Sequence, residues 1–170
     1  PTHKHIELAL VAAAAGANIF IDIPLSDSLD GTEDLAALID QKNLVSLMGF
    51  NLRFHPCIRR LKALVDEGVI GTVITVQAEV GSYLPGWHPW EDHRLGYAAR
   101  SDTGGGAVLA GGVHELDYMS WIFGEVSQVV SLTGTSGSLE LQGVEEAASV
   151  LLKFQTGAIG EMHCDLVQRP

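Results

Sequence analysis

A glycine run followed by a histidine and an acid is the part of this sequence best suited to chemistry. Gly104–Gly106 lead into a predicted helix in which His114 and Asp117 are three residues apart. Glycines let a backbone approach a ligand closely, and residues at i and i+3 of a helix lie on one side. An imidazole titrates near neutral pH, so His114 is a candidate proton donor or acceptor. The alternative is a glycine hinge beside a core histidine that bonds a carbonyl group.

A second group of polar and aromatic side chains lies in residues 81–103, which show no clear periodicity. A loop this long inside a compact domain is usually functional or disordered, and its aromatic content argues against disorder. The Tyr97 hydroxyl is a second candidate for proton transfer. Trp87 or Trp90 could stack on a sugar ring, and the candidates for contacting its hydroxyls are His88, Glu91, Asp92 and Arg94. The alternative is that the tryptophans only anchor the loop to the core.

The N-terminal part of the chain alternates between helical and strand patterns. Thr2–Ala15 is a predicted helix that ends before Gly16. Residues 19–23 form a run that is apolar apart from Asp22, which is typical of a strand buried on both faces. A helix near residues 33–42 and a strand over residues 44–50 follow. Strand, crossover helix and strand make a right-handed βαβ unit in a parallel sheet.

After Phe50 the pattern changes to that of an α+β unit with a largely antiparallel open sheet. One helix is predicted to begin at Pro56 and to end at Gly68, and a second to cover about residues 107–123. The strands are predicted over residues 72–80, 126–133, 147–154 and 158–166, with a tight turn at 155–157 between the last two. Glu145 and Glu146 are interpreted as a solvated strand edge. The fold class is therefore α/β, with an α+β domain after a parallel unit.

Composition narrows the functional classes. The 170 residues carry a formal net charge of −11 and no basic stripe, which excludes nucleic acid as an expected partner. The longest apolar stretch is too short and too mild to span a membrane. Cys57 and Cys164 are far apart and fit a reducing compartment, so a cytoplasmic location is expected. The histidines give an incomplete and scattered ligand set, so no metal site is expected.

Four stretches together resemble the Gfo/Idh/MocA oxidoreductase family in sequence, order and spacing. They are residues 1–5 (PTHKH), 19–26 (IFIDIPLS), 49–56 (GFNLRFHP) and 104–118, which run from the glycines to Tyr118. The resemblance covers nearly the whole chain. The loop over residues 87–97 also resembles a subgroup of this family found with bacterial surface-sugar biosynthesis.

The resemblance implies a fold, a cofactor and a substrate class. Residues 1–53 would be the C-terminal part of a Rossmann domain that binds NAD or NADP. Residues 54–170 would be most of a substrate-binding α+β domain, and the start at Pro1 is expected to be a truncation. The reaction would be hydride transfer between a sugar carbon and nicotinamide, with His114 moving the proton. Asp22, Pro24 and Arg53 would lie on the cofactor side, at the carboxyl edge of the parallel strands.

Three departures from the family pattern favour a rival hypothesis. The phosphate-binding pattern G-x-G-x-x-G is absent from the sequence, because Leu109 occupies the third glycine position after Gly104. Ile23 stands where the family usually has a lysine associated with catalysis, and Ala110 stands where it often has an aspartate. The rival is a non-catalytic relative that serves as a binding or assembly module. In either case, a homo-oligomer that pairs through the open sheet is expected.

Overall fold

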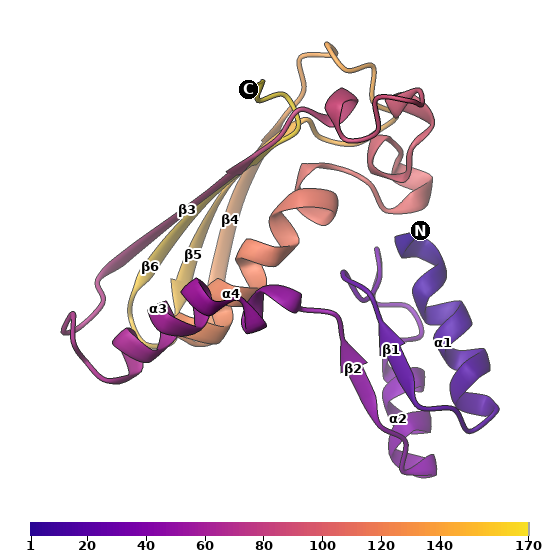
Figure 1. Cartoon of the computed structure of the whole chain (residues 1–170), viewed down its shortest axis with the longest axis horizontal. Helices are drawn as coiled ribbons and strands as arrows, with labels where there is room; N and C mark the ends of the chain where they lie inside the picture. The colour runs from indigo at the N-terminus through magenta and orange to yellow at the C-terminus, as the bar shows by residue number, and fades with distance from the viewer. Residues whose placement is uncertain (170) are drawn as a thin grey trace.

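The computed structural model describes residues 1–169, which form two sheets joined by a short connection (Figure 1). The first sheet has two parallel strands, β1 (Ile19–Ile21) and β2 (Ser46–Met48). The second has four strands in the order β3-β6-β5-β4. A single-turn helix, Asn51–Phe54, leads from β2 into the second part. The α/β class with a parallel and a mainly antiparallel sheet is therefore confirmed.

The N-terminal unit is the predicted βαβ arrangement, preceded by a helix. Helix α1 (His5–Ala14) follows a single turn at Thr2–Lys4, and α2 (Thr32–Lys42) connects β1 to β2. Ile19 and Ile21 are buried with residues of both helices. Phe20, between them, is 69% exposed. The prediction of a strand buried on both faces is therefore wrong for this chain, because its own helices cover one face only.

The four-stranded sheet is built from β3 (Thr75–Gly81), β4 (Val126–Gly134), β5 (Ala147–Phe154) and β6 (Ile159–Asp165). The β4–β5 and β5–β6 pairs are antiparallel, whereas β3 lies parallel to β6. The turn between β5 and β6 is closed by Phe154 N–H donating to the Ala158 carbonyl at 3.0 Å. These strands agree with the prediction to within three residues at each end.

One face of this sheet carries the main core. Helix α4 (Val113–Phe123) lies along the face that looks toward the N-terminal unit, with α3 (Pro56–Asp66) beside it (Figure 1). Met119 of α4 packs with Phe154 of β5, Met162 of β6 and Leu166, which directly follows β6. All four side chains are almost fully buried. Among residues 1–169, no helix covers the other face of this sheet. In the part of the chain that the structure describes, no helix is long and apolar enough to cross a bilayer.

Two irregular segments position the side chains of interest. The loop after β3 contains four single-turn helices, at Leu84–Gly86, His93–Leu95, Tyr97–Ala99 and Ser101–Thr103. Residues 108–112 form a π-helical turn that continues directly into α4. Single π-turns inside helices are often found at functional sites. The predicted helix over residues 107–123 is therefore present, with a widened first turn.

Candidate active site

The triple glycine lets three parts of the chain meet. A Cβ atom on Gly104 would lie 2.7 Å from the Cβ of Thr2, which connects the loop to the start of the N-terminal unit. A Cβ on Gly105 would lie 2.6 Å from the carbonyl oxygens of Tyr97 and Ala98. Gly106 has a φ of +105° and would place a Cβ 2.6 Å from the Glu145 carboxylate. The glycines were expected to let the backbone approach a ligand, but they admit the protein's own chain instead.

His114 lies in the first turn of α4, immediately after the π-turn. Its side chain is half-buried, and its Nδ1 atom is buried without a hydrogen-bond partner among residues 1–169. A core histidine that only stabilises the fold normally bonds through such an atom. The alternative of a histidine satisfied at Nδ1 by a carbonyl is therefore not observed. This nitrogen is therefore an unsatisfied polar group, and in this structure it is enclosed rather than open to a ligand.

Arg53 and Asp117 form an ion pair between the connection after β2 and helix α4. Arg53 Nε and Nη2 donate to the two Asp117 carboxylate oxygens at 2.9 and 2.5 Å. The guanidinium also lies 5.2 Å from the Phe50 ring centroid and 5.7 Å from that of Trp121. The hydrogen bonds to Asp117 raise the pKa of Arg53. In place of the expected cofactor group, the structure shows Arg53 paired with Asp117.

The turn after β1 brings Asp22 and Pro24 next to the second part of the chain. His5 of α1 bonds the Pro24 carbonyl oxygen through Nδ1 at 2.8 Å, and Asp22 Oδ1 accepts from Ile23 N at 3.0 Å. The negative charge of Asp22 acts on the Tyr97 hydroxyl. Burial, and after it the Asp22 carboxylate, raises the pKa of the Tyr97 hydroxyl. The carboxylate of Asp22, on the expected cofactor side, thus influences the hydroxyl of Tyr97, on the expected substrate side.

The loop side chains line a small hollow. Trp87, His88, Glu91, His93 and Tyr97 all contribute to its wall. His88 Nδ1 lies 2.8 Å from Glu91 Oε1. Trp90 is 78% exposed and lies outside the hollow, with its ring centroid 5.3 Å from that of His88. Of the two tryptophans considered for stacking, Trp87 is therefore the one that faces the hollow.

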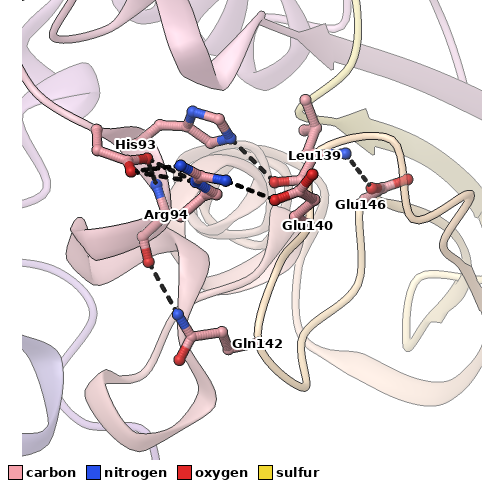
Figure 2. Close-up of polar contacts among 7 residues, drawn as sticks. His93, Arg94, Leu139, Glu140, Gln142 and Glu146 are labelled. Atoms are coloured by element: carbon pink, nitrogen blue, oxygen red, sulfur yellow. Dashed lines mark hydrogen bonds and ion pairs between the residues drawn. The ribbon is translucent and has the colours of Figure 1, made fainter.

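Arg94 is occupied by two carboxylates. Its Nε and Nη2 bond Asp92 at 2.9 and 2.7 Å, and its Nη1 donates to Glu140 Oε2 at 2.6 Å (Figure 2). The hydrogen bonds from Arg94 lower the pKa of Asp92 to about 2. A substrate hydroxyl would have to displace one of these bonds. The described contacts give Arg94 a role in fastening the loop to residues 139–142.

Three glutamates near the site were missed or misread. Glu115, next to His114, is 8% exposed, its Oε2 has no partner among the described residues, and burial raises its pKa. Glu146 is 2% exposed, and Glu145 accepts from Val108 N at 2.9 Å. The interpretation of Glu145 and Glu146 as a solvated strand edge is therefore wrong. The available signal was their place at the start of a strand whose alternate residues are apolar.

Comparisons with known proteins show what the chain as a whole is similar to. The profile described as GFO/IDH/MocA C-terminal domain matches residues 58–170. Levoglucosan dehydrogenase from Pseudarthrobacter phenanthrenivorans is 26% identical over 95% of this chain and 46% of its own length. Myo-inositol 2-dehydrogenase from Thermotoga maritima is 27% identical over 94% of this chain and 46% of its own length. The chain thus spans about half the length of the curated relatives it matches.

A solved structure shows the same fold over the whole chain. GenD2 from gentamicin A biosynthesis, crystallised in complex with NAD, superposes with a TM-score of 0.85 and 26% identity. The match covers 100% of this chain and 47% of that one. Both of the sheets described above therefore have a counterpart in a known protein.

Proposed function

The chain belongs to the Gfo/Idh/MocA family of oxidoreductases, and on that premise we propose that it supplies the substrate side of an NAD(P)-dependent sugar oxidoreductase. The observation that supports this most is that the N-terminal unit contacts the glycines that lead to the His114 helix: a Cβ on Gly104 would lie 2.7 Å from the Cβ of Thr2 and 3.0 Å from that of Asp27. Relatives named for levoglucosan and for myo-inositol support a polyhydroxylated ring as the substrate class. The boundary between the two domains is proposed near residue 53.

The cofactor, NAD or NADP, would supply a nicotinamide ring that accepts or gives the hydride. Asp22 and Pro24 are at the carboxyl edge of β1, where open α/β sheets bind ligands. The exposed Asp22 carboxylate is available to a polar ligand at this edge. We propose that these residues face the nicotinamide end of the dinucleotide. Arg53 is already paired with Asp117, so we propose that it positions Asp117 and does not bind a phosphate group of the dinucleotide.

Proton transfer is assigned to His114, with Tyr97 as a hydrogen-bond donor. Oxidation of a hydroxyl releases one proton along with the hydride, and a base near neutral pKa accepts it most efficiently. The raised pKa of Tyr97 keeps its hydroxyl protonated at neutral pH, so it can donate to the substrate oxygen but is a poor base. In the reverse direction His114 would return the proton.

The hollow beside Tyr97 has a volume of about 20 Å³, room for about one water molecule, so we propose that the sugar lies against its mouth rather than inside it. Trp87 offers a flat apolar surface, and His88 and Glu91 offer polar groups for hydroxyls. Arg94 keeps the loop in place through Asp92 and Glu140. We also propose a cytoplasmic homo-oligomer that pairs through the bare sheet face, where Val130, Leu132 and Leu151 are 65%, 78% and 52% exposed.

Dinucleotide titration followed by turnover assays tests this function. The complete reading frame that encodes this chain is titrated with NAD and with NADP by calorimetry, and it is then assayed with a panel of sugars and cyclitols. We expect micromolar binding of one dinucleotide, and reduction of that dinucleotide by at least one member of the panel. Tyr97→Phe should lower turnover less than loss of His114 does. Absence of both binding and turnover would contradict the proposal.

A second candidate, a non-catalytic binding or assembly module, is favoured by Ile23 and Ala110. Ile23 is half-buried and cannot carry a proton. Ile23→Lys separates the two functions. In an enzyme whose pocket keeps the family shape, the new ammonium should raise activity or shift its pH profile. In a module whose pocket has closed over Ile23, a buried unpaired lysine should instead destabilise the fold by several kcal/mol.

A further inference from the structure

Two adjacent glutamates at the start of β5 contact both sides of the proposed site, yet the proposed chemistry uses neither. Glu145 and Glu146 directly precede Ala147, the first residue of β5. Their side chains bond different segments of the chain. Because the two residues are consecutive, they connect these segments through a single peptide unit.

Glu145 holds the start of the helix that carries His114. Its Oε1 accepts from Val108 N at 2.9 Å, and its backbone oxygen accepts from Ala107 N at 3.2 Å. The first N–H groups of a helix have no partner within the helix, and a carboxylate there is also favoured by the helix dipole. Gly106 leaves the room that this carboxylate occupies. Glu145 therefore determines where the helix begins, less than two turns before His114.

Glu146 holds the loop between β4 and β5. Its Oε2 accepts from Ser136 N at 2.6 Å and from Ser136 Oγ at 2.7 Å, and its Oε1 accepts from Leu139 N at 3.0 Å. Burial alone would raise the pKa of Glu146, but these hydrogen bonds outweigh it and the pKa lies below its usual value. The carboxylate is thus charged at neutral pH, and it fixes residues 136–139.

The same loop holds the wall of the hollow. The Leu139 carbonyl bonds His93 Nε2 at 2.9 Å, and Gln142 Nε2 donates to the Arg94 carbonyl at 3.1 Å (Figure 2). Figure 2 shows Glu146 on one side of Leu139 and the His93–Arg94 segment on the other. Residues 93 and 94 lie between His88 and Tyr97 in the chain. The position of the hollow therefore depends on Glu146 through Leu139.

We propose that Glu145 and Glu146 are positioning residues that set the His114 helix and the Trp87–Tyr97 loop in register with each other. The proposal rests on the proposed function, in which the helix side moves the proton and the loop side binds the sugar. It predicts that the two neighbouring glutamates affect different kinetic constants. Loss of Glu145 should affect the chemical step, and loss of Glu146 should affect substrate binding.

Glu145→Gln and Glu146→Gln in the complete protein test this division. Glu145→Gln should lower kcat about 10- to 100-fold and change KM by less than about 2-fold, because small misplacements of a reacting group have effects of this size. Glu146→Gln should raise the sugar KM about 10-fold with a smaller change in kcat. Glu67→Gln, at the exposed end of α3, is the matched control and should leave both constants unchanged. If either variant fails to fold, Glu145→Asp and Ser136→Ala should give the same division with smaller changes.

A measurement that does not need turnover separates failure of the proposed function from failure of the positioning role. The NMR signals of the His114 ring are followed in the complete protein, with and without each substitution. Glu145→Gln should shift or broaden the His114 ring signals, and Glu146→Gln and Glu67→Gln should not. If the wild type oxidises no sugar but the His114 signals respond to Glu145→Gln, the proposed function fails and the positioning role stands. If the enzyme is active and both glutamine variants match the control in kcat, KM and His114 ring signals, the positioning role is wrong.

Discussion

The two sheets of this chain differ in how much of their covering the chain itself supplies. In the four-stranded sheet, α4 and the loops bury one face around residues such as Met119, Met162 and Leu166. In the two-stranded sheet, Phe20 and Leu47 remain 69% and 53% exposed, and Leu8 and Val11 of α1 are also exposed. The comparison teaches that an apolar strand pattern does not by itself show which faces of the strand are covered.

The largest expected effect concerns the junction between these regions. Gly105→Ala would place a methyl group 2.6 Å from two backbone carbonyls, which cannot rotate away. We expect a loss of about 2–4 kcal/mol in the free energy of unfolding, as for other overpacked sites. Gly111→Ala is the control, since no atom lies within 4 Å of its new Cβ. It should be neutral or gain up to about 1 kcal/mol. Equal denaturation midpoints for the two variants would show that the close approach at Gly105 is not rigid.

The second prediction compares the stability of the two sheets directly. Amide hydrogen exchange in the 170-residue chain should be about 100-fold or more slower in β5 and β6 than in β1 and β2, because few buried contacts hold the smaller sheet closed. Mass spectrometry of peptides from both regions measures the difference. Equal protection in the two sheets would mean that they open as one cooperative unit, and the comparison would lose its energetic basis.

The third prediction concerns the bare face of the larger sheet. Leu132→Lys puts a charge among the exposed apolar residues over β4 and β5, and it should weaken self-association about 10-fold, since a desolvated charge opposes a permanent interface. Gln77→Lys, on the exposed side of β3, should have a smaller effect. Sedimentation of both variants decides the point. A wild type that is monomeric at tens of micromolar would argue against an oligomer through this face.

The smallest expected effect is the pH dependence caused by Glu115. Burial raises its pKa above the ordinary value of 4.5, so the folded state binds this proton more tightly than the unfolded state. The stability it contributes is complete below pH 4.5 and is lost as the pH rises through the raised pKa. Glu115→Gln does not titrate and should gain up to about 1 kcal/mol relative to wild type between pH 4 and pH 7. A gain that stays constant across this range would mean that the carboxyl is not desolvated.

Much of the fold followed from local patterns, because strand alternation and helix termini depend on nearby residues. The βαβ unit, the strand over residues 147–154 and the helix leading to Phe123 were all predicted. The burial of Glu146 was not, because its partners Ser136 and Leu139 lie in an irregular loop without a pattern. The exposure of Phe20 was also missed, because an apolar strand pattern does not show which face of the strand is covered.

The residues of the candidate site could be proposed from their side-chain types, but their contacts could not be predicted. His114, Tyr97 and Trp87 were identified because their chemistry suits proton transfer and ring stacking. The engagement of Arg53 by Asp117 and of Arg94 by Glu140 joins residues 64 and 46 positions apart, and only the tertiary fold brings such pairs together. The role of the glycines changed for the same reason, because the atoms that approach them come from distant parts of the chain.

The most direct test of the account is the turnover of His114→Ala in the complete protein. With the sugar that the wild type oxidises, we predict that kcat falls on the order of 100- to 10,000-fold, the usual effect of removing a general acid–base group. The dinucleotide Kd should stay within about 3-fold, because we place the ring on the substrate side. Full turnover in His114→Ala, with the dinucleotide still bound, would contradict the assignment and would leave Tyr97 as the group that moves the proton.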